Sequence, residues 1–177
     1  MLYTCFYKSP LGGMTMASDG NALTGLWFDG QKYFAEGLTE TAAAKTLPVF
    51  DEAVRWLDIY FSGRRPDFTP PLNLKGTAFR KEVWQLLLQI PYGQTTTYGE
   101  LAAQLAAHNG LKQMSAQAVG GAVGHNPISI IVPCHRVVGT GGSLTGYAGG
   151  LAKKLALLKL EGIDTAKFTL PAKGMAL

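Results

Sequence analysis

A cysteine followed directly by a histidine is the part of this sequence best suited to covalent chemistry. Cys134 and His135 come directly after a run of β-branched residues. The thiolate is the nucleophilic form of cysteine, and a neighbouring histidine is a common base for generating it near neutral pH. The surrounding segment is almost free of carboxylates, which would keep the thiol protonated. We therefore predict that Cys134 is a nucleophile.

The composition is that of a folded protein. Of the 177 residues, 47% are hydrophobic and only 16% are charged, which excludes a disordered chain. No apolar run is long enough to span a bilayer, and no secretory signal is visible at the N-terminus. Two cysteines, Cys5 and Cys134, are too few for a disulfide framework, so we predict a cytoplasmic protein. The net charge of +4 permits an anionic partner without requiring one.

The chain as a whole is predicted to be α+β, and residues 1–70 are predicted to form an α/β scaffold domain. Strand patterns over residues 2–7, 14–17 and 22–28 are separated by turn sequences and predict a small antiparallel sheet. Apolar residues at helical spacing predict an amphipathic helix over residues 48–62. The stretch that follows this helix is rich in proline and arginine and is the best candidate for a linker, so we place the domain boundary at residue 70.

Residues 71–177 are predicted to be mainly helical. One helix is expected over residues 79–90, and a capping box at residues 97–100 begins a second. A third is expected over residues 115–123, so these last two helices are compatible with a helix-turn-helix unit, although most helix pairs bind no DNA. The final helix, residues 151–162, carries Lys153, Lys154 and Lys159, which we expect on a solvated face.

The third of these helices has unusually small side chains. Gly120 and Gly121 each cost about 1 kcal/mol relative to alanine inside a helix, so another surface is expected to approach closely. Packing against another helix of the protein is the more ordinary explanation. Insertion into a nucleic-acid groove is the alternative.

Several motifs of the second half together resemble the O6-alkylguanine-DNA alkyltransferases, also called methylated-DNA–protein-cysteine methyltransferases. Pro133-Cys134-His135-Arg136-Val137 is preceded by Gly124-His125-Asn126-Pro127 and followed by Gly146-Tyr147-Ala148-Gly149-Gly150, in the order and spacing of that family. The resemblance extends over residues 79–162 and is looser before them. It implies an N-terminal ribonuclease H-like α/β domain and a C-terminal domain with a winged helix-turn-helix-like unit.

The resemblance also implies a reaction, the transfer of an alkyl group from O6 of guanine in DNA to Cys134. His135 matches a base that acts through a water molecule, and Glu161 matches the carboxylate that orients this histidine. Together they make a nucleophile–base–orienter chain. Asn126 matches the asparagine that links the recognition helix to the active-site strand. Tyr98 matches the tyrosine that contacts the flipped nucleotide and its phosphate.

Further residues match the family's substrate and DNA contacts. Tyr147 matches a wall of the guanine pocket, and the carbonyls of Cys134 and Val137 match acceptors for the guanine amino group. The amide of Ala148 matches the donor to O6; the family has serine there, but the backbone donor survives the change. Additional contacts are expected from the small-faced helix and the pocket, at Ala116, Val123 and Arg136, of which Arg136 either supports the fold or touches phosphate.

One position departs from the family. In much of the family an arginine of the recognition helix enters the base stack and fills the gap that the flipped nucleotide leaves. Here this position is Gln117, which is shorter and uncharged. We expect weaker stabilisation of the extruded base and retained activity.

The resemblance implies a partner and a stoichiometry. The partner is double-stranded DNA containing O6-alkylguanine, with O4-alkylthymine as a second possible substrate, bound by a monomer through the minor groove without sequence preference. The reaction needs no cofactor or metal, and each chain reacts once. Two alternatives stay open, a cysteine hydrolase that turns over and a non-catalytic damage sensor that binds DNA.

Overall fold

The computed structural model describes residues 1–38 and 42–170, which fall into two compact units. The first unit holds residues 1–75 and 127–131, and the second holds residues 76–126 and the chain from residue 132 onward. The returning segment joins the first unit by backbone hydrogen bonds, from Leu26 N to the Pro127 carbonyl and from Ser129 N to the Leu26 carbonyl, both 2.8 Å long.

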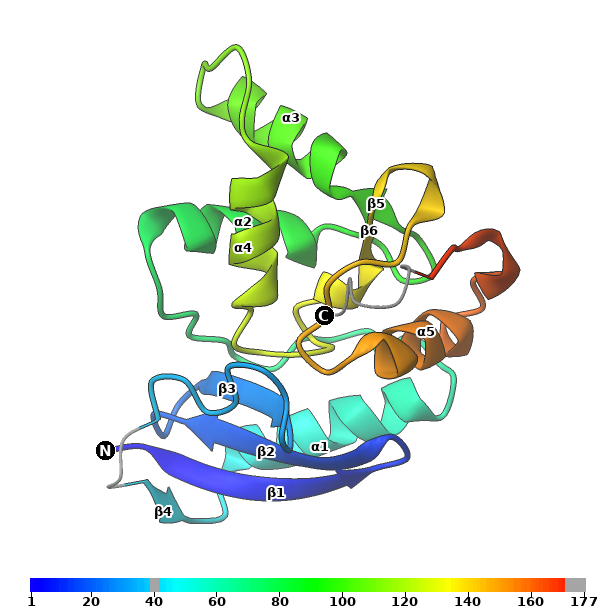
Figure 1. The fold of residues 1–177 in the computed structure, drawn as a ribbon. Helices are drawn as coiled ribbons and strands as arrows, with labels where there is room; N and C mark the ends of the chain where they lie inside the picture. Colours follow the sequence, from blue (N-terminus) through cyan, green and yellow to red (C-terminus); the bar gives the residue numbers. More distant parts are fainter. Residues whose placement is uncertain (39–41, 171–177) are drawn as a thin grey trace. The chain divides into compact units, whose positions relative to one another are not determined.

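The first unit is a four-stranded sheet with one helix on it (Figure 1). The strands β1 (Tyr3–Ser9), β2 (Gly12–Ser18) and β3 (Leu23–Phe28) form the predicted antiparallel meander. The two-residue strand β4 (Ala43–Ala44) adds a parallel edge to β1, which gives the order β3-β2-β1-β4. Helix α1 (Pro48–Phe61) contacts β1 and β2.

The turn between β2 and β3 shows why this part of the sequence folds locally. The Asp19 carboxylate accepts hydrogen bonds from the backbone N–H groups of Asn21 and Ala22, at 2.9 and 3.0 Å. Gly20, between Asp19 and Asn21, has a φ of 106°, a conformation that glycine adopts without steric cost. An Asp-Gly-Asn sequence therefore determines the reversal of the chain from nearby contacts alone.

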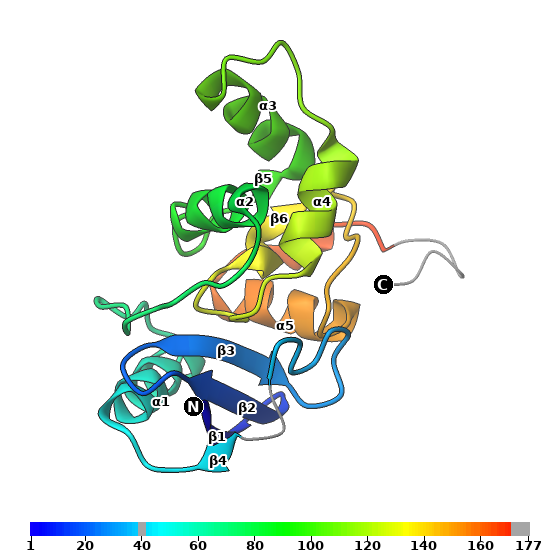
Figure 2. The same ribbon diagram turned by 90° about the vertical axis from the view of Figure 1, so that its left-hand side faces the viewer.

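The described part of the second unit contains four α-helices: α2 (Ala78–Leu88), α3 (Tyr98–His108), α4 (Ala116–Gly124) and α5 (Leu151–Leu160). Figure 2 shows α2, α3 and α4 lying together, and α4 contacts both of the others. The strands β5 (Thr96–Thr97) and β6 (Val137–Val138) pair in parallel. Short 3₁₀ helices occupy Cys134–Arg136 (η1), Thr140–Gly142 (η2) and Thr165–Lys167 (η3). The α+β class is confirmed.

Two contacts position the paired helices α3 and α4. Thr97 accepts a hydrogen bond from Glu100 N at 3.1 Å while the Glu100 carboxylate accepts one from Thr97 N at 2.9 Å, so the predicted capping box is confirmed. The indole of Trp84 on α2 is buried and donates to the Ala122 carbonyl of α4 at 2.8 Å.

Among the helices that the structure describes, none combines the length and the hydropathy needed to cross a membrane.

Candidate active site

The Cys134 side chain is buried at the first position of η1, 7% exposed. Residues 129–131, in the run of β-branched residues before it, form a turn. Backbone hydrogen bonds close tight bends from Ile131 N to the Ser129 carbonyl and from Cys134 N to the Val132 carbonyl, each 2.8 Å. Ile130 is buried with a φ of 71°, so β propensity gives way here to the sharp return of the chain.

Burial controls the resting state of the thiol. Desolvation raises the pKa of Cys134 above its ordinary value. A hydrogen bond from the Asn126 side chain, the charge of Lys154 and backbone N–H groups act in the opposite direction. The thiol is therefore protonated at rest, in a site that already holds groups able to stabilise its thiolate. Such a site needs a base to remove the proton.

His135, which follows Cys134 in the chain, forms a buried pair with Glu161. The His135 side chain is 0% exposed, and its Nε2 is hydrogen-bonded to the Glu161 carboxylate at the end of α5. Burial lowers the pKa of His135, although Glu161 acts against this, so the imidazole is neutral near pH 7. Burial alone would raise the pKa of Glu161, but His135, Arg136 and the Gly93 N–H hold it at about 2.

The Glu161 carboxylate is also bound by other parts of the second unit. Arg136 Nε donates to Oε1 at 2.8 Å, and the backbone N–H of Gly93 donates to the same oxygen at 3.0 Å. A second nitrogen of the guanidinium, Nη1, donates to the Ile90 carbonyl at 2.7 Å. Of the two roles left open for Arg136, support of the fold or contact with phosphate, these contacts favour the first, because the buried guanidinium binds Glu161 and Ile90.

Lys154 is a site residue that the sequence reasoning missed. The prediction of a solvated face is wrong for this lysine: it is 0% exposed, and Nζ donates to the carbonyls of Val137 (2.5 Å) and Thr145 (3.1 Å). Burial lowers the pKa of Lys154 to about 8, and the Cys134 charge opposes this. Helical spacing could have indicated that Lys154 is buried, because it lies on the same face of the helix as Leu151 and Leu158.

Tyr98 lies at the beginning of α3, where it faces the same carbonyls. Its hydroxyl donates to the Thr145 carbonyl at 3.0 Å, and Lys154 Nζ lies 6.0 Å from the centre of its ring. Burial, together with the charge of Cys134, raises the pKa of Tyr98 to about 12. The phenol therefore keeps its proton and remains a hydrogen-bond donor near the thiol.

The other predicted residues fall into two groups. Asn126 is buried, and its Nδ2 donates to the Val132 carbonyl at 2.7 Å, which ties the end of α4 to the segment before Cys134. The side chains expected around the guanine pocket are buried or half-buried: Val123, Val137, Tyr147 and Ala148. Ala116 and Gln117, in contrast, are exposed at the beginning of α4.

The small residues of α4 are not explained by packing inside the unit. A Cβ added to Gly121 would meet nothing within 4 Å, and one added to Gly120 would lie in ordinary contact with Tyr98, at 3.7 Å. Neither glycine is therefore required by a neighbouring helix. Their cost in helix stability favours the alternative explanation, the close approach of an external surface.

Known proteins resemble this chain over most of its length. Residues 78–163 match the family model "6-O-methylguanine DNA methyltransferase, DNA binding domain", and residues 1–74 match its "ribonuclease-like domain". The methylated-DNA–protein-cysteine methyltransferase of Mycobacterium tuberculosis H37Rv is 47% identical over 164 residues, which cover 91% of this chain and 93% of the relative.

A second relative and a solved structure agree with this similarity. The protein of the same name from Haemophilus influenzae is 43% identical, over 92% of this chain and 87% of its own. The crystal structure of Mycobacterium tuberculosis OGT in complex with DNA superimposes with a TM-score of 0.78 at 43% identity, covering 94% of each chain.

Proposed function

Because the chain belongs to the 6-O-methylguanine DNA methyltransferase family, we propose that it is a DNA repair enzyme that transfers an alkyl group from O6 of guanine to the sulfur of its own Cys134. The observation that carries the proposal is the buried Cys134 thiol, whose thiolate Asn126 and Lys154 stabilise. His135 and Glu161, hydrogen-bonded to each other next to it, supply the base and its orienting carboxylate.

The chemistry follows from these groups. The proton of the Cys134 thiol passes through a water molecule to His135, and Glu161 stabilises the imidazolium that results. The thiolate attacks the alkyl carbon, so an S–C bond forms while the C–O6 bond breaks. The electron pair of the broken bond remains on the guanine, whose negative charge is balanced by the proton on His135 and stabilised by a hydrogen bond from the Tyr98 hydroxyl.

The product explains why each chain reacts once. An S-alkylcysteine is a thioether, which lacks the electrophilic carbonyl that water attacks in the thioester of a cysteine protease. No residue of the site supplies a second step, and the acceptor sulfur stays occupied. We therefore describe the protein as a stoichiometric reagent that requires no cofactor for the transfer.

The reacting base has to leave the duplex to reach a buried thiol. We place α4 in the minor groove, where its exposed small residues permit contact with the sugar–phosphate backbone and Gln117 stands at the gap in the base stack. Backbone contacts carry no sequence information, so binding without sequence preference follows, as a search for damage requires. The DNA-binding part is the domain of residues 71–177, the remainder is scaffold, and a monomer suffices for the reaction.

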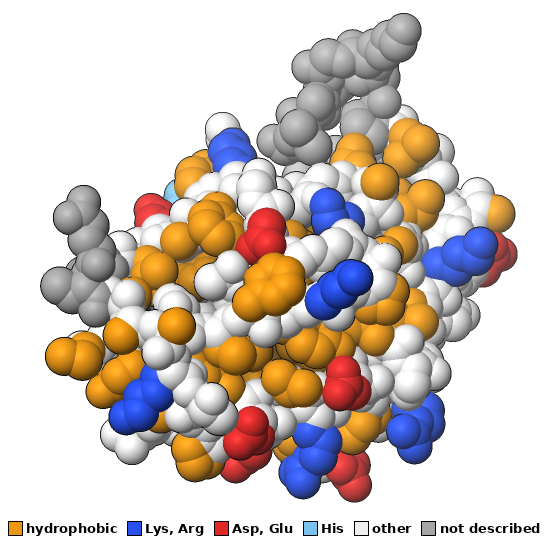
Figure 3. Space-filling view, turned by 90° about the horizontal axis from the view of Figure 1, so that it is seen from below, with side chains coloured by type: hydrophobic (Ala, Val, Ile, Leu, Met, Phe, Trp, Pro, Cys, Tyr) orange, Lys and Arg blue, Asp and Glu red, His pale blue; other side chains and the backbone are white. Residues whose placement is uncertain are grey.

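Charge on the face drawn in Figure 3 is mixed. On the face drawn in Figure 3, basic and acidic side chains alternate with hydrophobic ones, so the described residues of this face make no continuous basic field. The formal net charge of the whole chain is only +4. The face drawn in Figure 3 therefore offers no broad electrostatic surface for DNA.

The decisive measurement is the stoichiometry of modification. After incubation with an excess of duplex containing O6-methylguanine, intact-mass and peptide analysis are expected to find one added methyl group per chain, located on Cys134. The time course should end at one equivalent. Continued turnover would instead indicate a hydrolase, and binding of the damaged duplex without modification would indicate a damage sensor. O4-methylthymine duplex, used in parallel, tests the second substrate.

Gln117→Arg is expected to tighten binding to alkylated duplex DNA. Arginine restores a longer, charged side chain at the exposed beginning of α4, where it fills the base stack and adds one phosphate contact. The slope of log Kd against log salt should increase by about 1. The matched control is Gln85→Arg, which adds the same charge at an exposed position of α2. Equal affinities of both variants and the natural protein would contradict the role assigned to Gln117.

A further inference from the structure

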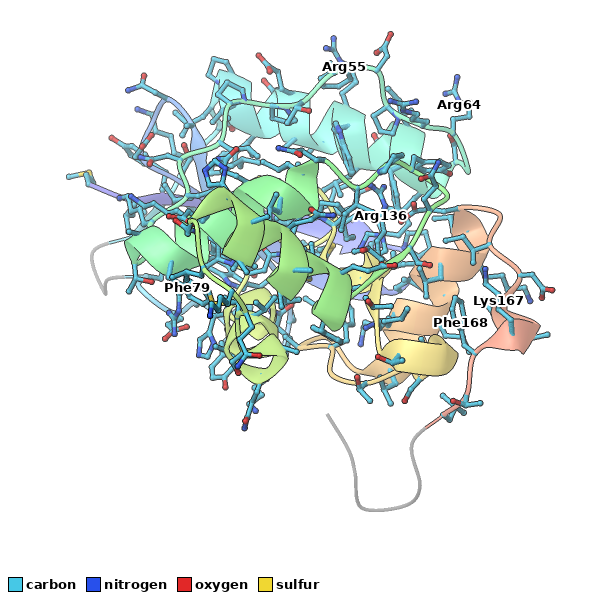
Figure 4. All side chains as sticks on the ribbon, turned by 90° about the horizontal axis from the view of Figure 1, so that it is seen from above. Arg55, Arg64, Phe79, Arg136, Lys167 and Phe168 are labelled. Carbon is cyan, nitrogen blue, oxygen red and sulfur yellow. The ribbon has the colours of Figure 1, made fainter. Side chains whose placement is uncertain are left out.

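Arg136 is a buried cation that the alkyl transfer itself does not use. It is 7% exposed, and its guanidinium binds the Glu161 carboxylate through Nε and the Ile90 carbonyl through Nη1. The Tyr92 ring lies 5.7 Å from the guanidinium carbon. In Figure 4 Arg136 lies among other side chains, whereas Arg64 extends from the edge of the ribbon. Arg136 therefore acts on other residues of the second unit.

The charges around Glu161 determine what a proton does at His135. When Arg136 is cationic, Glu161 anionic and His135 neutral, these three side chains together carry no net charge. Protonation of the imidazole would then leave an extra positive charge in a buried site that also faces Lys154, which is unfavourable. Without Arg136 the same site would hold an uncompensated carboxylate, which attracts a proton onto the His135–Glu161 pair.

We propose that Arg136 is a positioning residue that keeps the His135 imidazole neutral by compensating the charge of Glu161, so that His135 is ready to accept the Cys134 proton. This inference rests on the proposed function, because it concerns the readiness of the same base. Without Arg136, the His135–Glu161 pair holds a proton up to a higher pH than in the natural protein. It can then accept none from the thiol until the pH is raised.

The shape of arginine suits this position. Its planar guanidinium donates in two directions from fixed positions, here to the carboxylate at the end of α5 and to the carbonyl after α2. A lysine ammonium at the same place retains the charge but has no such fork. The charge and the geometry of Arg136 are therefore separable by substitution.

The test compares Arg136→Met with Arg136→Lys in single-turnover methyl transfer as a function of pH. The rate of transfer falls below a certain pH. In Arg136→Met this pH is expected to be higher by about 1 to 3 units, so that the lost rate returns at alkaline pH. Arg136→Lys should keep this pH near its natural value. Arg64→Met removes an exposed arginine and is the matched control. Arg136→Gln serves as a second neutral variant if Arg136→Met fails to fold.

A second readout is independent of alkyl transfer. In a Cys134→Ala background, NMR titration of the His135 ring should show protonation at a higher pH once Arg136 is replaced by methionine or glutamine. A uniform loss of rate at every pH, with an unmoved His135 titration, would overturn the proposal and leave Arg136 as a fold residue. If no variant or natural protein transfers a methyl group, the proposed function fails, while the NMR titration still decides the role of Arg136.

Discussion

Cys134→Ala is expected to abolish alkyl transfer entirely while the protein still binds DNA that contains O6-alkylguanine. Alanine removes the acceptor sulfur and little else, since the side chain at this position is small and buried. The exposed residues of α4 that we assign to DNA binding are unchanged. The measurements are methyl incorporation by mass spectrometry and the affinity for a damaged duplex, on the same preparation.

The second cysteine provides the matched control for this experiment. Cys5 lies in β1, where burial, with Asp51 adding to it, raises the pKa of its thiol. Among the described residues, the groups that shift the pKa of Cys5 are Asp51 and the Phe6 backbone, whereas a cation and an amide act on Cys134. Cys5→Ala should therefore still accept one methyl group per chain. Methyl transfer by Cys134→Ala, or its loss in Cys5→Ala with the fold intact, would show that we have chosen the wrong acceptor.

Lys154→Met is expected to slow alkyl transfer by roughly 10- to 1,000-fold, because the loss of a nearby cation makes the Cys134 thiolate harder to form by about 1 to 3 pKa units. Methionine has a similar length and retains the packing of α5. It also removes the donor that holds the carbonyls of Val137 and Thr145, the second of which accepts from Tyr98. The rate of single-turnover transfer against pH measures both effects.

Lys159→Met is the control for Lys154→Met. It removes the same charge from an exposed position of the same helix and should leave the rate near that of the natural protein. An equal rate for both variants, with unchanged melting temperatures at neutral pH, would mean that the buried ammonium does not assist the thiolate.

The same lysine predicts a pH dependence of stability. Because the pKa of Lys154 is about 8 in the folded protein against an ordinary value of 10.5, the unfolded chain binds more protons between these values. The contribution of this group to the free energy of unfolding therefore rises as the pH increases from about 8 to 10.5. Denaturant titrations should show this gain in the natural protein relative to Lys154→Met.

Local features of the fold were predictable because near neighbours decide them. The Asp19 turn and the capping box of Thr97 and Glu100 each depend on residues a few positions apart, and the three antiparallel strands pair with their neighbours along the chain. The pairing of β4 was not predictable from its two residues, since two alanines carry no strand pattern. The turn before Cys134 was not predictable from its residues, because β-branched side chains favour a strand while the returning chain holds Ile130 at a positive φ.

The sequence by itself determined the candidate nucleophile and its neighbour, since the Cys134-His135 motif and its flanking segments identify the family. Only the tertiary structure decided the protonation states and partners of the site. Glu161 reaches His135 from 26 positions along the chain, and Lys154 is charged inside the protein, not on a solvated face. Arg136 likewise changes from a candidate phosphate contact to the partner of Glu161. The physical reason is that desolvation and charge compensation depend on what folding places around a group, which the order of residues does not state.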